Sequence, residues 1–282
     1  MAKWPFQGVA SQAASEKAQL VIHVGDYLYR ESPCPTDKQA LCGGTPAGDN
    51  WDAWNADFFQ PAAKLLAAAP WAFSRGNHED CKRSWRGWFY YLDPRPFSLT
   101  CAVYSPIYLI KLGGFELAML DSSAAKEDSA ETKQVAEYTA QLQSLHANNA
   151  WLVDHHPFWG FRTANDGTPE PISAPLEAAW ENAKPAGIRM ALAGHVHLFE
   201  LLIFDQDRPP QIVAGDGGTD LASPIRASVD GSRIQGAQVV MSGSQHEYGY
   251  TVLEKRPSGW ALTLRGRTGE DLFHYSLPLT KN

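Results

Sequence analysis

The most constraining feature of this sequence is a set of four short apolar runs, each ending at residue types that commonly bind metal ions. The runs end at Asp26, at Asn77-His78, at Asp154-His155-His156 and at Gly194-His195-Val196-His197. Short apolar runs between turn residues are typical of buried strands, and functional residues collect just beyond the carboxyl ends of such strands in an open α/β sheet. We therefore expect these side chains, far apart in sequence, to converge at one edge of a sheet.

The residue types at these positions indicate what they bind. Carboxylate, amide oxygen and imidazole together form a mixed oxygen and nitrogen ligand set that suits Fe, Mn or Zn. An aspartate can bridge two cations, and two cations about 3.5–4 Å apart can activate a water and neutralise a phosphoryl oxygen. The sequence thus predicts a two-metal hydrolase.

Strand and helix patterns alternate along the first two thirds of the chain. Helical patterns cover residues 6–18, 51–69, 129–146 and 174–184, and strand patterns cover 20–24, 71–74, 103–111, 115–120, 150–154 and 189–193. Pro106 interrupts one of these strands, and from Phe199 onward short β runs follow at 211–214, 237–241, 248–254, 260–265 and 272–277. This alternation predicts a layered α/β core. No repeat or linker divides the chain, so we expect residues 1–282 to form a single domain with two sheets.

Charge and hydropathy exclude several classes of protein. The chain has 24 basic and 31 acidic residues, a formal net charge of −7, which argues against nucleic acid as a stable partner. No apolar stretch approaches the roughly 18 residues of a membrane helix, so we expect no membrane partner. The N-terminus lacks the apolar core and cleavage site of a signal peptide. Nothing in the sequence indicates the oligomeric state.

The four cysteines look like two pairs. Cys34 and Cys42 bracket a loop that contains Pro and Gly, Cys81 follows the Asn77 segment, and Cys101 ends a later run. None has the CxxC spacing of a zinc or redox motif. Two disulfides would suit an oxidising compartment, periplasmic or extracellular. Four unpaired thiols are the alternative that the sequence leaves open.

Taken together, the four segments resemble the calcineurin-like metallophosphoesterases. The form Gly25-Asp26-Tyr27-Leu28-Tyr29 looks most like the purple acid phosphatase branch, and the resemblance runs from about residue 20 to residue 200. It implies a four-layer αββα sandwich with a binuclear site. It also implies a small phosphate-ester substrate and two metal ions, Fe together with Zn, Mn or a second Fe.

The resemblance assigns metal-binding roles to six residues. In the family pattern Asp26 would bridge the two metals. Tyr29 would donate a phenolate to a ferric ion in the first site, which His197 would complete. The other three residues would hold the second metal. The implied metal ligands are Asp26, Tyr29, Asn77, His155, His195 and His197.

Substrate contacts follow from the same pattern and from the neighbouring residues. His78 would hydrogen-bond the substrate phosphate or protonate the leaving group, with Asn77 also contacting substrate. Arg162 lies shortly after the third segment, where its guanidinium could meet phosphate. His155 and His156 are both candidates for the ligand of that segment, and the family places its ligand two residues before proline, which favours His155.

One departure from the family pattern concerns the beginning of the chain. The family opens with an aspartate on a strand that precedes the first helix, whereas here no acidic residue precedes Glu16. We therefore expect the first strand and the first-metal aspartate to be missing from an N-terminally truncated form, whose signal peptide would also lie upstream. Such a chain would keep the second metal site better than the first.

Two rival interpretations remain open. A non-catalytic metal- or phosphate-binding protein with an incomplete site would share all four segments. A structural extracellular domain with aromatic carbohydrate contacts would use the ten tryptophans but would leave the histidines unexplained.

Overall fold

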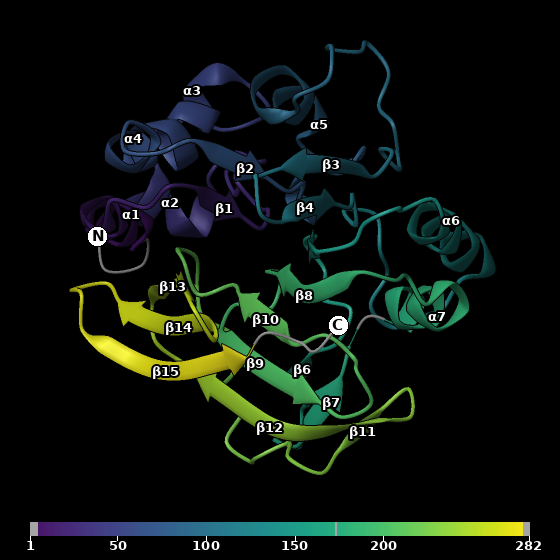
Figure 1. The fold of residues 1–282 in the computed structure, drawn as a ribbon. Coiled ribbons are helices and arrows are strands. Elements are labelled where there is room, and N and C mark those ends of the chain that lie inside the picture. Colours follow the sequence, from purple (N-terminus) through teal and green to yellow (C-terminus); the bar gives the residue numbers. More distant parts are fainter. Residues whose placement is uncertain (1–4, 173, 279–282) are drawn as a thin grey trace.

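A mixed eight-stranded sheet runs through the centre of the fold (Figure 1). The computed structural model describes residues 5–172 and 174–278. The strand order is β11-β12-β9-β10-β8-β5-β4-β3, and β4, β5, β8 and β10 run parallel to one another. The strands are β3 (Tyr108–Lys111), β4 (Glu116–Met119), β5 (Ala150–Val153), β8 (Ile188–Ala193), β9 (Phe199–Phe204), β10 (Gln211–Ala214), β11 (Arg233–Ile234) and β12 (Ala237–Gln245).

Smaller sheets face this large one. The strands β1 (Val21–His23) and β2 (Trp71–Phe73) form a parallel pair. The strands β13 (Gly249–Arg256), β14 (Gly259–Gly266) and β15 (Asp271–Pro278) form an antiparallel sheet. A short hairpin, β6 (Phe161–Thr163) with β7 (Pro169–Pro171), follows the third ligand segment.

The helices cover the two outer faces of these sheets (Figure 1). One pair of helices packs on the large sheet, and the helices of the N-terminal third pack on the β1–β2 side. The helices are α1 (Phe6–Ala13), α2 (Gln39–Cys42), α3 (Trp51–Trp54), α4 (Gln60–Leu66), α5 (Trp85–Gly87), α6 (Thr132–Gln143) and α7 (Ala174–Ala183). A π-helical turn, Asn55–Phe59, joins α3 to α4 just before Pro61.

The alternation of side chains along β4 shows how the layers are held together. Ala118 contacts the core beneath α6 and α7, whereas Leu117 and Met119 point to the other face and join the core shared with Leu262 and Leu264 of β14. Successive strand residues point to opposite faces, so each strand of the large sheet contributes to both cores. The order helix, sheet, sheet, helix confirms the predicted four-layer αββα sandwich.

The observed elements differ from the expected ones mainly at their ends. The strand expected over 103–111 begins only at Tyr108. Pro106 has no backbone N–H to give to a neighbouring strand, which explains the late start. The helix expected over 6–18 ends at Ala13 and continues as a 3₁₀ turn over Ala14–Glu16.

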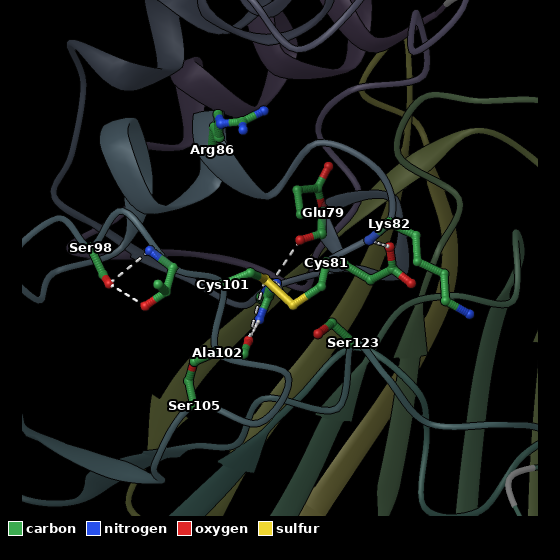
Figure 2. Close-up of a disulfide and its surroundings, with 12 residues drawn as sticks. Glu79, Cys81, Lys82, Arg86, Ser98, Cys101, Ala102, Ser105 and Ser123 are labelled. Carbon is green, nitrogen blue, oxygen red and sulfur yellow. Dashed lines mark hydrogen bonds between the residues drawn. A yellow bond between two sulfur atoms is a disulfide. The ribbon is translucent and has the colours of Figure 1, made fainter.

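Both expected cysteine pairs are disulfides. Cys34 is bonded to Cys42, and Cys81 to Cys101. The second disulfide ties the segment after Glu79 to the one before Ala102 (Figure 2). Two disulfides fit an extracellular protein. Within residues 5–172 and 174–278, no helix is both long and apolar enough to cross a membrane.

Glu200, the second residue of β9, makes the stability of the fold depend on pH. It is 1% exposed, its carboxylate accepts a hydrogen bond from the Phe161 N–H at 3.1 Å, and burial raises its pKa to about 8. The folded state therefore holds this proton more tightly than the unfolded chain. The stability that the group contributes is present at pH 4 and is lost as the pH rises towards 8.

We expect Glu200→Gln, which stays uncharged, to be more stable than the wild type at pH 8 by on the order of 3 kcal/mol, with little difference at pH 4. Urea unfolding of the chelator-treated protein at both pH values measures this. Glu247→Gln removes the same charge from an exposed position and serves as the control. If the free energy of unfolding changed equally between pH 4 and pH 8 in the wild type and in Glu200→Gln, Glu200 would not be the group responsible for the pH dependence.

Candidate metal centre

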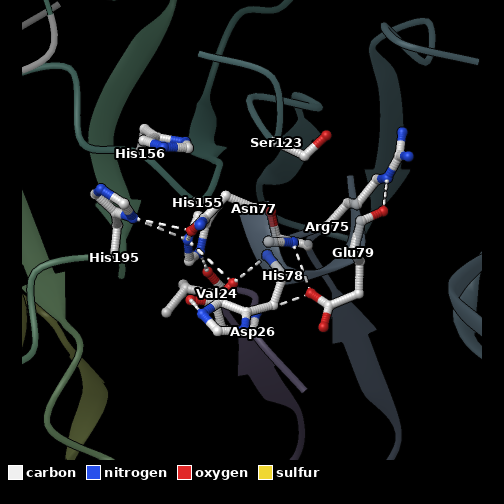
Figure 3. Close-up of polar contacts among 12 residues, drawn as sticks. Val24, Asp26, Arg75, Asn77, His78, Glu79, Ser123, His155, His156 and His195 are labelled. Carbon is white, nitrogen blue, oxygen red and sulfur yellow. Dashed lines mark hydrogen bonds and ion pairs between the residues drawn. The ribbon is translucent and has the colours of Figure 1, made fainter. Parts of the chain in front are cut away.

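Four strand ends deliver the predicted ligands to one place. Asp26 follows β1, Asn77 follows β2, His155 follows β5 and His195 follows β8. All four strands end at the same edge of the two facing sheets, and Figure 3 shows the side chains pointing toward one another. The convergence expected from the apolar runs is therefore observed.

The donor atoms of three of these residues lie within hydrogen-bonding distance of one another. Asn77 Oδ1 is 2.8 Å from His155 Nε2 and 3.1 Å from His195 Nδ1. The two imidazole nitrogens are 3.2 Å apart, and Asp26 Oδ1 is 3.3 Å from His155 Nε2. One amide oxygen and two imidazole nitrogens thus face one another, with a carboxylate oxygen of Asp26 beside His155, and this donor set fits a transition-metal cation.

The ring nitrogens on the outer side of the histidines are each held by an oxygen. Such a contact orients the ring and, when the outer nitrogen carries the proton, leaves the inner nitrogen with a free lone pair for a metal. The partners are Val24 O for His155 Nδ1 at 2.7 Å, Glu127 Oε1 for His195 Nε2 at 2.5 Å, and Asp220 O for His197 Nδ1 at 2.9 Å.

A second group of donors lies on the other side of Asp26. The Tyr29 hydroxyl is 3.2 Å from Asp26 Oδ2 and 3.4 Å from His197 Nε2. Asp26 therefore presents Oδ1 to His155 and Oδ2 to Tyr29. A carboxylate with one oxygen in each of two donor groups has the arrangement that a bridging ligand requires.

The electrostatics favour the charge states that metal binding needs at Asp26, His195 and His197, whereas the pKa values of His155 and Tyr29 are raised. Burial would raise the pKa of Asp26, but the imidazoles of His155 and His78 outweigh this and hold it far below its usual range, so the carboxylate is ionised. Burial lowers the pKa of both His195 and His197, which favours neutral rings. Burial also lowers the pKa of His155, but the charge and hydrogen bond of Asp26, with Val24 O and Glu79, together raise it above its ordinary value.

The backbone around the centre is unusual where it aims these side chains. Asp26 and His195 have φ of 59° and 67°, a left-handed conformation that is uncommon for residues other than glycine. Gly25 has φ of 103°, and a Cβ at this position would lie 2.3 Å from the His155 ring. A Cβ on Gly76 would lie 2.1 Å from Asp26 Oδ1. Such strain persists where surrounding contacts fix it, as is common at functional sites.

Glu79 holds the backbone of two ligand loops together. Its fully buried carboxylate accepts hydrogen bonds from the N–H groups of Asp26 at 3.2 Å, Tyr27 at 2.9 Å, Leu28 at 3.1 Å and Gly76 at 3.2 Å. One side chain thus satisfies four backbone donors. This residue was not among those predicted from the sequence, although its place directly after Asn77-His78 was a signal.

His78 lies beside the Tyr29 half of the centre. Its Nε2 is 3.9 Å from Asp26 Oδ2, and its ring centroid is 4.1 Å from that of Tyr29. On the opposite side, its Nδ1 is 2.6 Å from Glu31 Oε1, and Arg83 contacts both the ring and Glu31. The ring is therefore oriented by a carboxylate, with Nε2 toward the centre. The sequence analysis did not single out Glu31.

His156 is buried beside the centre but does not face Asn77. Its ring centroid is 4.0 Å from that of His195, and ligand-type atoms of His155, His156 and His195 lie within 4.8 Å of one another. The Ser122 hydroxyl accepts the N–H groups of both His155 and His156. Of the two adjacent histidines, His155 is the one whose nitrogen approaches Asn77 and Asp26.

Arg162 is not brought into this cluster directly. Its guanidinium forms ion pairs with the carboxylates of Glu127, Asp128 and Glu170. Only Glu127 links it to the centre, because the other oxygen of Glu127 contacts His195. The guanidinium has five N–H donors and is partly exposed, so donors remain for a phosphate oxygen, but the charge of the three carboxylates opposes an anion there.

Glu127 is a residue that the sequence analysis did not find and that should affect metal affinity. Outer carboxylate partners of metal-binding histidines typically change affinity by 10–100-fold when removed. We expect Glu127→Ala to weaken metal binding by about tenfold or more, and Glu127→Gln, which keeps an acceptor oxygen, to weaken it less. Competition with a chelator measures this. Glu170→Ala, which also loses a contact to Arg162, is the matched control. Equal losses in Glu127→Ala and Glu170→Ala would contradict a role through His195.

Comparison with known proteins identifies the family of this chain and structures with a similar fold. A model of the calcineurin-like phosphoesterases matches residues 6–199. The fold is similar to that of the purple acid phosphatase PPD1 from yellow lupin seeds, with 18% identity and a TM-score of 0.57. That match covers 98% of this chain and 49% of the lupin chain. This chain therefore spans about half the length of the lupin phosphatase.

Two further structures have a similar fold. PhoD is 15% identical with a TM-score of 0.58, over 98% of this chain and 67% of that one. GAP50, described as the anchor in the inner membrane complex of Plasmodium, is 12% identical with a TM-score of 0.58. That match covers 98% of this chain and 85% of the GAP50 chain. At such identities the likeness shows the fold alone. No curated protein sequence matches the chain.

Proposed function

The chain belongs to the calcineurin-like phosphoesterase family, and from this premise we propose that it is a hydrolase of small phosphate esters with a binuclear metal site. The observation that carries the proposal is the meeting of Asn77 Oδ1, His155 Nε2 and His195 Nδ1 beside the ionised Asp26. We further propose that residues 1–282 act as one domain in a periplasmic or extracellular compartment.

In this proposal the two donor groups hold different metals. Asn77, His155 and His195 would hold one metal ion, Tyr29 and His197 would hold the other, and Asp26 would contribute an oxygen to each. The phenol of Tyr29 favours Fe in its site, with Zn, Mn or a second Fe in the other. When bound, two such cations supply Lewis acidity toward the phosphoryl group and lower the pKa of a water.

The remaining residues orient the substrate and move protons. Because Glu31 faces the Nδ1 of His78, Nε2 is directed to the centre, where it can hydrogen-bond a phosphate oxygen or protonate the departing oxygen. Asn77 uses its carbonyl oxygen toward the histidines, which leaves its amide N–H groups for a phosphate oxygen. Arg162 contacts a phosphate oxygen through the N–H donors that its three carboxylate partners leave unused.

Hydrolysis of para-nitrophenyl phosphate after loading with Fe, Mn or Zn tests the proposal. We expect turnover in the wild type and a loss of at least about a hundredfold in His195→Ala, because one imidazole ligand is removed. His146→Ala changes an exposed histidine and should keep the wild-type rate. An unchanged rate in His195→Ala would reject the proposal. Bis-para-nitrophenyl phosphate in the same assay distinguishes diester from monoester substrates.

A second candidate is a non-catalytic metal- or phosphate-binding protein. Its support is the composition of the Tyr29 half, to which the described part of the chain contributes Tyr29 and His197 besides the shared Asp26. A further carboxylate there would complete the donor set. Extending the chain by a strand that bears an aspartate distinguishes the candidates. A steep rise in hydrolysis supports an enzyme whose Tyr29 half needs a further carboxylate, whereas metal binding without hydrolysis in both forms supports the binding protein.

A further inference from the structure

One of the two disulfides follows the second ligand segment directly. Cys81 comes two residues after Glu79, whose carboxylate holds the backbone of two ligand loops. Its bond to Cys101 spans a sequence separation of 20, which includes α5 and the π-helical turn Trp88–Leu92 (Figure 2). Both cysteines are partly exposed, so a reductant in solution can reach the bond. This disulfide therefore fixes the chain just beyond the segment that carries Asn77.

A buried arginine joins this disulfide to the ligand loops. Arg75 is 2% exposed, and its Nη2 lies 3.2 Å from Cys101 Sγ and 3.8 Å from Cys81 Sγ. The same guanidinium donates through Nε to Glu79 O at 2.9 Å (Figure 3) and through Nη1 to Asp121 Oδ2 at 3.0 Å. One cation thus contacts both sulfur atoms, the backbone of Glu79 and the buried carboxylate of Asp121.

Asp121 extends this link to the third ligand segment. The residue after it, Ser122, accepts hydrogen bonds from the N–H groups of His155 at 3.0 Å and His156 at 2.9 Å. Arg75 therefore lies between the segment that presents Asn77 and the loop that holds the backbone of the third segment. A change at the disulfide can reach both segments through this one side chain.

The contacts of the other disulfide are different in kind. Cys34 Sγ lies 3.4 Å and Cys42 Sγ 3.7 Å from the same backbone oxygen, Lys38 O. A carbonyl oxygen is only an acceptor and cannot stabilise a thiolate, whereas a guanidinium can. This bond spans a sequence separation of 8 in the segment before α3. The chain thus carries its own control for a disulfide without an arginine beside it.

We propose that the Cys81–Cys101 disulfide is a redox switch that sets the rigidity of the ligand loops. With the bond closed, Arg75 holds Glu79 in place, and Glu79 caps the N–H groups of residues 26–28 and of the loop that follows β2. With the bond open, these loops gain freedom. The proposal concerns the loops of the metal-free chain, so it does not depend on the proposed hydrolase function.

The arginine determines how the bond opens. The sulfur whose thiolate is more stable is the better leaving group in thiol–disulfide exchange, and Cys101 Sγ is the one closer to Arg75. A dithiol reductant attacks Cys81 Sγ, Cys101 leaves as a thiolate facing the guanidinium, and the second thiol of the reductant then displaces Cys81. The reductant becomes a disulfide and gives two electrons to the two cysteines. One of its protons goes to Cys81 and the other to solvent.

Opening the bond acts on Glu79 in two ways. A disulfide restricts the chain between its cysteines, so reduction frees the segment that begins two residues after Glu79. The new negative charge at Cys101 also competes with Asp121 for the guanidinium of Arg75. Both changes weaken the hydrogen bond from Arg75 Nε to Glu79 O, which fixes the backbone from which the Glu79 carboxylate projects.

Amide hydrogen exchange of the chelator-treated full chain tests the proposal without any contribution from bound metal. The double variant Cys34→Ser/Cys42→Ser keeps the disulfide beside Arg75, and dithiothreitol then opens that bond alone. We expect exchange at Gly76 and at residues 26–28 to become about tenfold faster or more, with no change in β8. Alkylation and peptide mass spectrometry confirm that the bond is open.

Two further measurements complete the test. Cys81→Ser/Cys101→Ser should exchange fast at the same amides with or without dithiothreitol. Glutathione, a monothiol, stops the reaction of the first variant at a mixed disulfide, which we expect on Cys81. Unchanged exchange at these amides after the bond opens would overturn the proposal. Equal acceleration throughout the chain would also overturn it, because the disulfide would then hold the whole fold. Glutathione on Cys101 would contradict the role of Arg75.

Discussion

Replacing Asp26 by asparagine is expected to remove most metal from both halves of the centre and to lower aryl-phosphate hydrolysis by at least about a thousandfold. Asp26 has Oδ1 near His155 and Oδ2 near Tyr29, so it is the residue shared by both donor groups. An amide has no negative charge to balance two cations, and only one of its two polar atoms can act as a ligand. No other substitution in the centre affects both sites at once.

Elemental analysis for metal content and the para-nitrophenyl phosphate assay for hydrolysis rate test this prediction on the same samples. Asp52→Asn makes the same chemical change at an exposed position of α3 and should leave the metal content and the hydrolysis rate unchanged. Circular dichroism of Asp26→Asn checks that the fold persists, since the His78 N–H loses a charged acceptor at 3.1 Å. Wild-type metal content in folded Asp26→Asn would refute the bridging role.

Glu79→Ala is expected to destabilise the fold by about 4 kcal/mol, among the largest effects of any single substitution in this chain. Its carboxylate accepts four backbone N–H groups at the ends of β1 and β2, and removing it leaves these donors without partners in a buried environment. An unsatisfied buried donor costs about 1–3 kcal/mol, and relaxation and entering water reduce the sum.

Urea unfolding of the metal-free protein measures the effect without a contribution from bound metal. Glu79→Gln keeps one acceptor oxygen and should lose about half as much stability as Glu79→Ala. Glu131→Ala, a change at an exposed position before α6, should lose less than 1 kcal/mol. A loss below 1 kcal/mol in Glu79→Ala would mean that the loops keep their shape without this carboxylate.

The sequence predicted the layers of the fold and the meeting of four strand ends because both follow from local patterns. Apolar runs such as 150–154 and 189–193 have the length and composition of buried strands, and a parallel sheet brings their ends to one edge. The family match and the fold confirm the resemblance. The roles of individual site residues stay predictions, although their convergence agrees with them.

The carboxylates that support the centre could not be predicted in this way. Glu31, Glu79 and Glu127 act through contacts with residues 47–68 positions away, such as His78, Leu28 and His195. Nothing in the local pattern around an acidic residue shows which distant ring or N–H it will face. The same holds for Arg162, whose three carboxylate partners become visible only once the loop before α6 is placed beside β6 and β7.

Short elements at the periphery of the fold were also not predicted from the sequence. The hairpin of β6 and β7 and the two-residue strand β11 carry too few residues to show alternation. The strand β9 lies in the β-rich part expected after Phe199, but it was not defined as a run of its own. Its apolar residues fit a buried helix segment as well as a strand, because a short continuous run has no period to separate the two.

The most direct test of the metal centre is the metal content per chain after equilibration with Fe, Mn and Zn and removal of loosely held ions. Inductively coupled plasma mass spectrometry gives this number for the wild type. Two donor groups that share Asp26 predict close to two metals per chain, with Fe as one of them. One metal or fewer per chain would contradict the account, because the two donor groups would then not each hold a metal ion.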